Sequence, residues 1–343
     1  MSKKECPRVS IVVLNYNGKR FLDRCLNSVF SQSYSNFEVM FVDNASTDGS
    51  VEYLITKFGH DARLKVVENE KNYGPIEGNN VGIRRMDQQT KYVILLNNDI
   101  ELTDNWVGMM VDVMESDSTI GAACSKQLLM DDPTRLQGIG SFIDFYGFNY
   151  QLGDGEIDRG QYDNKILEIF AGGTTALIVR TELLKKVGLL DTKYSHGFDD
   201  VDFCWRIWLS GYRVCSVTKC AIFHTVSGTT KRVHRDHVVF HREKNRMMTA
   251  IKNYSITFQL RILPVILLFD LMQFLWFTFT KRLDFSWAIA KALAWDITHF
   301  KYIWTAHLKI QYHIRRVSDK EVMTHMLKTN FFELWRRMLT VSP

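Results

Sequence analysis

The first part of the chain alternates between two hydrophobic patterns. Runs of β-branched and aliphatic residues predict four buried strands, at 9–14, 38–42, 64–68 and 91–96. Apolar residues at helical spacing predict helices between them, over 21–29, 51–58 and 79–86. Strands that alternate with helices pair in parallel through right-handed crossovers, so we expect the loops after the strands to open on one edge of the sheet.

The predicted strands end in polar residues of the types that bind ligands. The fourth strand stops on Asn97, Asn98 and Asp99, at the sheet edge where open α/β folds place their ligands. The second strand ends at Asp43, whose carboxylate can accept hydrogen bonds from a base or a ribose. Tyr16, after the first strand, can stack on a base.

The same loops have a structural alternative. Asn15, Asn17, Asp43 and Asp48 are of the types that cap helices and build turns. Asp48 and Ser50, just ahead of the predicted helix at 51–58, are expected to act as caps.

Composition narrows the class of protein. The 343 residues are 46% hydrophobic and 24% charged, which is typical of one large folded domain or a domain plus an appendage. A formal net charge of +5 is too small to indicate nucleic-acid binding, and the sequence lacks the interleaved arginine and aromatic residues of an RNA-binding sheet. The six cysteines lack Cys-x-x-Cys spacing and no signal peptide precedes Pro7, so we expect reduced thiols and an active site on the cytoplasmic side.

Four segments in this order resemble family 2 glycosyltransferases, particularly their rhamnosyltransferase-like branch of cell-surface polysaccharide enzymes. They are 10–18 (SIVVLNYNG), 42–50 (VDNASTDGS), 72–83 (NYGPIEGNNVGI) and 95–100 (LLNNDI). The resemblance runs from about Val9 to His224. It implies a GT-A fold, which is a Rossmann-like α/β fold with a mostly parallel central sheet flanked by helices. It also implies a nucleotide-diphosphate sugar donor and inversion at the anomeric carbon.

The resemblance also implies a donor site. Carried over by position, Tyr16 and Asp43 hold the nucleoside. Asn72, Gly74 and Asn79 line the donor pocket. The predicted donor site is completed by Leu14, Asn98 and Gly173.

A metal site with an unusual ligand set is implied next. Asp99 corresponds to the last carboxylate of the family's Asp-x-Asp signature, which binds a divalent cation bridging the donor phosphates, but the first carboxylate is replaced by Asn97. An amide oxygen is a hard ligand for Mn²⁺ or Mg²⁺ that adds no negative charge. The stretch 212–224 resembles the family segment whose histidine reaches back to the metal, so His224 is the third predicted ligand; a purely structural histidine is the alternative.

The segment 196–206 (HGFDDVDFCWR) is similar to the family's acidic signature at the start of a helix. By alignment Asp200 is the catalytic base, and Asp199 orients the acceptor or the loop. Clustered carboxylates repel one another, which raises one pKa toward the neutral range that suits a base. Asp202, four residues before Arg206, is placed for an ion pair within the helix. The alternative is an acidic helix N-terminus that only complements the helix dipole.

Three further segments carry predictions. In 170–178, Gly172 and Gly173 allow the backbone to approach a sugar, with a plain β-bend as the alternative. The aromatic and glycine-rich segment 138–163 is predicted to be a variable acceptor-side or lid loop. His234, His237 and His241 recur at helical intervals, which indicates a basic amphipathic surface rather than a second metal site.

The pattern changes to long helices after residue 245. We therefore predict a GT-A catalytic domain at 1–245 and a helical, membrane-associating or oligomerisation region at 246–343. The apolar segment 262–280 is nearly long enough to cross a bilayer, but Asp270 at its centre is costly there. An interfacial or re-entrant helix is expected, with packing against a second subunit as the alternative. The basic residues ahead of it predict a juxtamembrane collar or a solvated helix face: Lys231, Arg232, Arg235, Arg242, Lys244 and Arg246.

Together these features predict an inverting, metal-dependent glycosyltransferase of cell-surface polysaccharide synthesis. Its expected donor is a UDP- or dTDP-sugar, with rhamnose among the candidates, and its acceptor a membrane-held saccharide or polyprenyl-linked glycan. We expect it at the cytoplasmic face of the cell membrane, with homo-oligomerisation left open. The alternative is a catalytically degenerate sugar-nucleotide-binding subunit. A nucleotidyltransferase is disfavoured, because residues 15–18 are not a glycine-rich basic loop.

Overall fold

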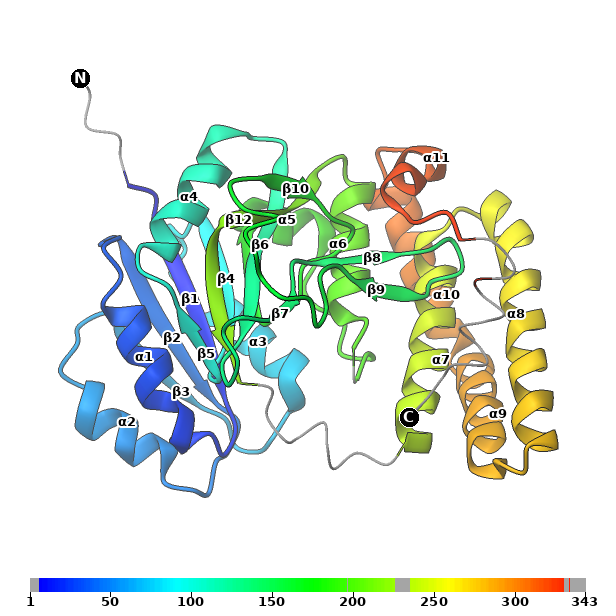
Figure 1. Ribbon diagram of the computed structural model, residues 1–343, viewed down its shortest axis with the longest axis horizontal. Helices are drawn as coiled ribbons and strands as arrows, with labels where there is room; N and C mark the ends of the chain where they lie inside the picture. The colour runs from blue at the N-terminus through cyan, green and yellow to red at the C-terminus, as the bar shows by residue number, and fades with distance from the viewer. Residues whose placement is uncertain (1–5, 196, 226–234, 330–332, 334–343) are drawn as a thin grey trace.

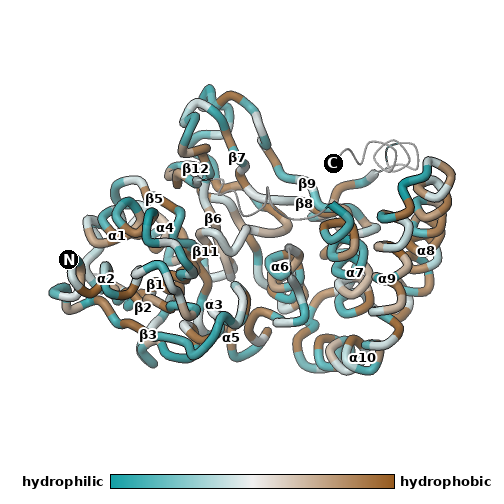
Figure 2. The backbone as a smooth tube through the Cα atoms, turned by 90° about the horizontal axis from the view of Figure 1, so that it is seen from below, coloured by the Kyte–Doolittle hydropathy of each residue, from teal (hydrophilic) through white to brown (hydrophobic). Residues whose placement is uncertain are grey.

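The computed structural model describes residues 6–195, 197–225, 235–329 and 333. Within them lies a ten-stranded mixed sheet of order β10-β12-β6-β11-β4-β1-β2-β3, to which β5 and β7 add by pairing with β12 and β6. Helices cover both faces of the sheet, and a helical bundle lies beside it at the end opposite β3 (Figures 1 and 2). Several sequence predictions fall outside the described residues, namely those on Lys231, Arg232, His196 and His234.

The first half of the sheet is parallel, as predicted. Its strands are β1 (Val9–Asn15), β2 (Phe37–Asp43), β3 (Leu64–Glu68) and β4 (Tyr92–Asn97). The connections hold η1 (Lys19–Phe21), α1 (Leu22–Phe30), α2 (Ser50–Phe58) and α3 (Gly74–Arg85). Because these strands run in the same direction, the loops that follow them share one edge of the sheet.

Helix α3 begins five residues before the start predicted at residue 79. Pro75 occupies its first turn, where the missing N–H costs nothing, and Gly74 precedes it with φ +82°. The apolar periodicity begins only after this turn. The prediction of the helix start was therefore wrong because capping residues, rather than hydrophobic spacing, define it.

The second half of the sheet is mixed. Its long strands are β6 (Ile120–Leu129), β11 (Ala176–Arg180) and β12 (Arg213–His224). Strand β11 is antiparallel to β4 and β6, whereas β12 runs parallel to β6. The remaining elements are β5 (Ile100–Leu102), α4 (Trp106–Ser116), β7 (Leu136–Gly138), β10 (Ile166–Glu168), α5 (Thr181–Val187) and α6 (Asp199–Leu209).

The segment predicted as a lid loop at 138–163 contains a hairpin of β8 (Ser141–Ile143) and β9 (Asn149–Gln151). Its turn is held by the C-terminal helices: Tyr254 Oη donates to the carbonyl of Phe145 at 2.9 Å, and Arg246 Nη1 donates to that of Tyr146 at 3.3 Å. The hairpin is thus tied to the bundle. Its aromatic residues pack there instead of forming an open loop.

The C-terminal bundle is continuous with the catalytic part. Its main helices are α7 (Arg235–Asn253), α8 (Ile256–Phe279), α9 (Leu283–Thr298) and α10 (Phe300–Lys309), followed by η3 (Ile310–Ile314), α11 (Asp319–Val322) and η4 (Met323–His325). The predicted boundary between residues 245 and 246 lies inside α7. Trp205 of α6 packs edge-on against Tyr254 with ring centroids 4.7 Å apart, and one hydrophobic cluster includes both regions.

Two of the basic residues predicted as a collar or solvated face are buried. Arg246 is fully buried and pairs with Glu243, with 2.6 Å between Nη2 and Oε2, and with Asp270 of α8. Lys244 is also buried and donates to the carbonyl of Lys193 at 2.9 Å. For Lys244 and Arg246 the prediction was wrong, because Lys193 and Asp270, which bury them, lie on segments distant in sequence.

Candidate active site

The end of β4 and the end of β12 bring two predicted metal ligands together. The chain turns after Asp99 into β5, which pairs antiparallel with β12 so that His224 lies opposite Ile100. His224 Nε2 lies 3.5 Å from Asp99 Oδ1, and both side chains are largely buried. The histidine suggested by the family resemblance therefore reaches the carboxylate after β4.

The two groups have the chemistry of cation ligands. Gln137 Oε1 lies 2.6 Å from His224 Nδ1, and since a carbonyl oxygen only accepts, Nδ1 carries the proton and Nε2 can ligate. Asp99 Oδ1 is buried with no hydrogen-bond donor among the described residues. A buried carboxylate oxygen facing an imidazole nitrogen in this way fits a divalent cation.

Asn97 closes β4 and is half-buried. Its backbone N–H donates to the carbonyl of Thr175 at 2.9 Å, which joins the end of β4 to the small-residue segment 170–178. Its role as a metal ligand stays a prediction. Among the described residues there is no cluster of three or more His, Cys, Asp or Glu side chains that could hold a metal ion.

A cavity of about 290 Å³ adjoins Asp99. Two exposed arginines, Arg20 and Arg24, line it from the η1–α1 segment, with Asp131 also at its wall. Neither arginine forms an ion pair with any residue that the structure describes. The two like charges, one on η1 and one on α1, repel each other where they line the same cavity, so an anion there is favoured.

The predicted nucleoside residue Asp43 lies buried at the end of β2 beside Asn15. Its Oδ1 accepts from Asn15 Nδ2 at 2.8 Å and from Ser46 Oγ at 2.6 Å, and its Oδ2 accepts from the N–H of Ser46 at 2.7 Å. Asn98 Nδ2 in turn donates to Asn15 Oδ1 at 2.6 Å. These contacts build the turn, as the structural alternative expects, and nucleoside binding by Asp43 stays a prediction.

The other predicted donor residues lie around the same edge. Tyr16 is 51% exposed after β1, which leaves its ring free to stack, and Leu14 is half-buried. Asn72 Oδ1 accepts from the N–H of Gly74 at 2.8 Å and so shapes the start of α3. Asn79 is buried, and its Oδ1 has no hydrogen-bond partner among the described residues.

Asp48 bonds to the first turn of α2 next to the N-cap residue Gly49, whereas Ser50, which was also predicted as a cap, is the first residue of the helix. Asp48 Oδ1 accepts from the N–H of Ser50 at 3.1 Å at the start of α2, and its Oδ2 accepts from the N–H of Lys19 at 2.9 Å. Ser50 itself donates its hydroxyl to Asp48. These two residues therefore join the loops after β1 and β2.

The predicted base lies at the first turn of α6. Burial, and then repulsion from Asp199, raise the pKa of Asp200 to about 7. Burial also raises the pKa of Asp199, whose Oδ2 lies 3.4 Å from Thr174 Oγ1. A Cβ placed on Gly173 would lie only 4.0 Å from Asp200 Oδ2, so the small-residue segment passes directly beside the predicted base.

Asp202 has a different environment from its two neighbours. It forms the predicted ion pair with Arg206 at 3.0 Å, and Lys252 Nζ lies 2.8 Å from its other oxygen. Burial alone would raise the pKa of Asp202, but Lys252 and Arg206 outweigh it and hold the pKa at about 2. Asp202 is therefore a permanent anion that anchors α6, whereas Asp200 titrates near neutral pH.

Several supporting residues were not predicted. Gln137 orients His224, and Asn245 and Lys252 of α7 contact the segment that carries the aspartates. No spacing or motif marks Gln137. Polar residues recur along α7 in the sequence, but the histidines among them were predicted to lie on a basic, solvent-exposed surface.

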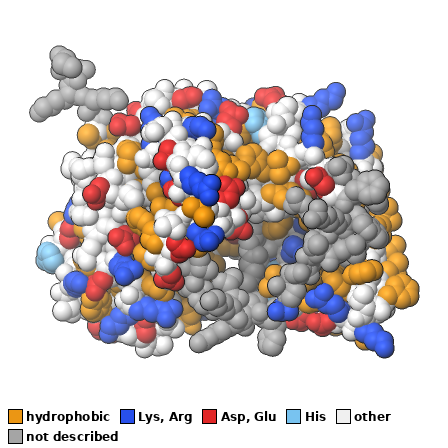
Figure 3. Space-filling view, viewed as in Figure 1, with side chains coloured by type: hydrophobic (Ala, Val, Ile, Leu, Met, Phe, Trp, Pro, Cys, Tyr) orange, Lys and Arg blue, Asp and Glu red, His pale blue; other side chains and the backbone are white. Residues whose placement is uncertain are grey.

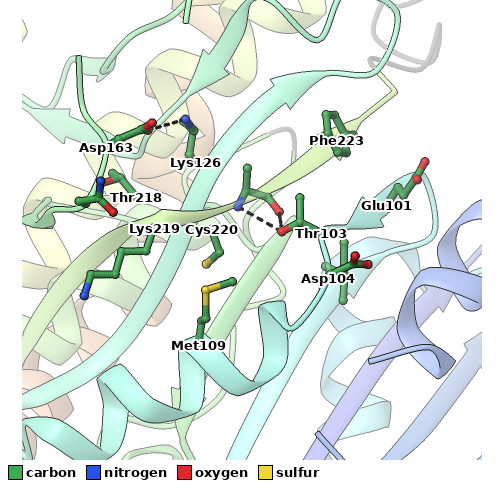
Figure 4. A pocket seen from close by; sticks show the side chains of 13 residues that line it. Glu101, Thr103, Asp104, Met109, Lys126, Asp163, Thr218, Lys219, Cys220 and Phe223 are labelled. Atoms are coloured by element: carbon green, nitrogen blue, oxygen red, sulfur yellow. Dashed lines mark hydrogen bonds and ion pairs between the residues drawn. The ribbon is translucent and has the colours of Figure 1, made fainter. Parts of the chain in front are cut away.

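A larger cavity, of about 590 Å³, lies elsewhere on the sheet (Figure 4). It lies between α4, β5 and β12, and Lys126 points across it to Asp163 at 2.6 Å. None of the predicted site residues lines it. The candidate chemistry gathers instead at the carboxyl edge of β1, β2 and β4.

The chain is similar to known glycosyltransferases. Residues 10–175 match the model of the family described as Glycosyl transferase family 2. An uncharacterized glycosyltransferase of Haemophilus influenzae is 29% identical over 119 residues, which cover 35% of this chain and 36% of that protein. TuaG of Bacillus subtilis, named for teichuronic acid biosynthesis, is 28% identical over 130 residues, or 38% of this chain and 51% of that protein. The chain thus matches only part of the length of these relatives.

Solved structures share the fold at low sequence identity. GalNAc-T7 with UDP, GalNAc and Mn²⁺ superposes with a TM-score of 0.59 at 16% identity, covering 75% of this chain and 50% of that one. The mannosyltransferase PcManGT of Pyrobaculum calidifontis, in complex with GDP-Man and Mn²⁺, gives a TM-score of 0.54 at 18% identity, covering 90% and 88%. Residues 10–175 therefore resemble a glycosyltransferase family 2 domain, and the chain has the GT-A fold.

Proposed function

We propose that this chain is an inverting, metal-dependent glycosyltransferase that uses a nucleotide-diphosphate sugar. The observation that carries the proposal is a continuous set of contacts. Asp99 and His224 meet at the end of β4, Asn97 bonds to Thr175, and Gly173 in the same segment lies against Asp200. A candidate cation site and a carboxylate with a pKa near neutral are thus joined through one short loop.

We assign each site residue a separate role in an in-line displacement at the anomeric carbon. Asp200, ionised above about pH 7, accepts the proton of the acceptor hydroxyl as that oxygen attacks the anomeric carbon. Asp99, His224 and Asn97 would hold Mn²⁺ or Mg²⁺, which when bound neutralises charge on the diphosphate leaving group. Arg20 and Arg24 add positive charge beside Asp99, where they can bind the departing diphosphate.

The donor and acceptor follow from chemistry and from the relatives. Neighbours that share the fold bind UDP or GDP-Man, and we propose a UDP- or dTDP-sugar, with rhamnose among the candidates, in keeping with the rhamnosyltransferase-like motifs. TuaG is named for a cell-surface polysaccharide, which supports a saccharide or polyprenyl-linked acceptor held at the membrane. The nucleoside is expected between Tyr16 and Asp43.

Helix α8 supports attachment to the cytoplasmic face of a membrane. By length and composition, it is the one helix in the described part of the chain that is apolar enough to cross a bilayer. Only 33% of its most apolar window is buried inside the protein, so most of this window is available to contact lipid. Three of its polar residues, Gln259, Asp270 and Gln273, face inward and are buried. Its outer side is apolar and lies along one edge of the molecule (Figure 3), with Leu260, Leu267, Leu268, Leu271, Leu275 and Phe279 exposed.

This reversed polarity fits a helix lying in the lipid interface. A charged partner group for Asp270 is supplied by Arg246 within the protein, so the helix enters lipid on one side only. Arg261 and Lys281 flank the apolar side and match anionic headgroups. The active site would then lie at a fixed distance from the membrane surface, where it can reach an acceptor held in the membrane.

Replacing Leu267 and Leu271 together with glutamate is expected to lower binding to phosphatidylglycerol-containing vesicles by at least ~10-fold, because each leucine loses its apolar burial in lipid. Flotation of the purified protein with these vesicles measures the fraction of protein that is bound to lipid. Ile55→Glu on α2, which is equally exposed at 54%, is the matched control and should float as wild type. Lipid binding would be refuted by two results together. The wild-type protein would stay in the aqueous phase as a dimer, and the double variant would be a monomer.

Sugar transfer itself is tested by screening nucleotide sugars with Mn²⁺ and Mg²⁺. We expect a selected donor to raise the melting temperature only when the metal is present, since ligand binding to the folded state adds stability by mass action. The same donor should be hydrolysed slowly, and transferred to a polyprenyl-linked acceptor. Metal-dependent binding without either reaction would favour the alternative, a degenerate sugar-nucleotide-binding subunit, for which the replacement at Asn97 is the supporting observation.

A further inference from the structure

One side of α7 carries a ladder of polar side chains, defined here as His241, Asn245, Thr249 and Asn253. They are four residues apart, so they line one side of the helix, and all four are buried. Each contacts the segment that leads into α6 or α6 itself. The pairs are His241 with Ser195, Asn245 with Ser195 and Gly197, Thr249 with Tyr194, and Asn253 with Asp202.

The segment that this ladder contacts has an uncommon backbone. Gly197 has φ +91° and Phe198 has φ +70°, immediately before Asp199 and Asp200. A bulky residue in the left-handed region is strained and persists only where the surroundings hold it. The position of the predicted base therefore depends on what fixes this turn.

Asn245 makes the most direct of these contacts. Its Nδ2 donates to the carbonyl of Ser195 and to that of Gly197, both at 2.9 Å, and the side chain is fully buried. One amide group thus uses both of its N–H donors, one on a carbonyl just before the turn and one on the carbonyl of its first residue. No other α7 residue bonds to both carbonyls among the described residues.

The ladder holds α6 at a second point, one turn further on. Asn253 Nδ2 donates to Asp202 Oδ1 at 3.0 Å, and Lys252 pairs with Asp202 at 2.8 Å and with Asp191 at 2.6 Å. The helix that carries Asp200 is therefore held on both sides of the base. Thr249, bonded to Tyr194 Oη at 2.8 Å, lies between these two points.

We propose that Asn245 is a positioning residue for the base Asp200, and that α7 is therefore part of the active site rather than only the start of a membrane or oligomerisation region. The inference rests on the proposed function for the identity of the base. The physical reason is that proton transfer depends steeply on placement, and an error of about 1 Å costs ~100-fold in rate.

The experiment compares N245A with M248L. Met248 lies on the same helix and is equally buried, but it makes apolar contacts, so M248L controls for changes within α7. N245A is expected to lower kcat for transfer by ~10- to 100-fold, while the Kd for the nucleotide donor changes less than about twofold. The acid limb of its pH–rate profile should also move, because Asp200 leaves its buried site. A residue with only a structural role would leave both kcat and the pH profile of the folded enzyme unchanged.

Hydrogen exchange provides a readout independent of activity. The amides of residues 197–200 are expected to exchange at least ~10-fold faster in N245A than in M248L, whereas those of β1 and β2 stay the same. Equal exchange in the two variants would overturn the inference, even if no donor is turned over. If N245A does not fold, N245D is measured instead, since it keeps the volume but loses both donors. Absence of transfer by wild type would refute only the proposed function.

Discussion

Replacing Asp99 with alanine is expected to abolish metal-dependent sugar transfer, whereas replacing Asn97 with alanine is expected only to weaken it. Asp99 is the one carboxylate after β4 that faces His224, and its Oδ1 has no other partner among the described residues. Loss of that charge removes several kcal/mol of stabilisation from the leaving group in the transition state, which corresponds to a ~1,000-fold decrease in kcat/KM. Loss of a neutral amide ligand should cost about 10-fold, the lower end of effects seen when metal-site contacts are removed.

The measurement is kcat/KM over a Mn²⁺ titration, which separates weaker metal binding from slower chemistry. Asp104→Ala is the matched control, because Asp104 is an exposed acid only five residues further along and lies outside the site. It should behave as wild type. If N97A loses as much activity as D99A at saturating Mn²⁺, the ranking of carboxylate over amide is wrong. If D99A keeps its metal dependence, the site itself is elsewhere.

The parallel half of the fold was predictable because its signals are local. The four strands end within one or two residues of the predicted bounds, since β-branched runs flanked by turn residues leave little ambiguity. The mixed half was not. Strand β11 inserts between β4 and β6, although it lies far from both in sequence, and no hydrophobic period encodes such a neighbour.

The candidate site shows the same division. Asp99, His224 and Asp200 were predicted because their motifs resemble a family, and the structure brings the first two within 3.5 Å. Gln137, which orients His224, has no local signal, because its role exists only through a contact across the sheet. Arg246 was misplaced for a similar reason. It pairs with Glu243 on its own helix, but its burial depends on Asp270, which comes from another helix and has no local signal.

Replacing Asp200 with asparagine is expected to lower kcat by ~100- to 10,000-fold, the usual contribution of a general base. In wild type, kcat should fall as pH drops through about 7, because Asp200 takes up a proton there, and this acid limb should be absent in D200N. Asp199→Asn, a change of the same kind at the neighbouring carboxylate, is the control and should keep an acid limb. An Asp200→Asn enzyme with normal turnover would remove Asp200 from the mechanism.

The same carboxylate should lower the stability of the wild-type protein above neutral pH. The pKa of Asp200 is raised from an ordinary value near 4 in the unfolded chain to about 7 in the folded one. Between these two values the folded state binds the extra proton, so the stability that this group contributes is present below about pH 4 and is lost as pH rises to about 7. D200N has no proton to lose. Urea denaturation should therefore give the variant a higher free energy of unfolding than wild type at pH 8, with the difference shrinking as pH falls toward 5. If the variant is less stable than wild type at pH 8, the folded protein stabilises the charged form of Asp200. The pKa of Asp200 would then not be raised by burial, as the assignment of this carboxylate as the base requires.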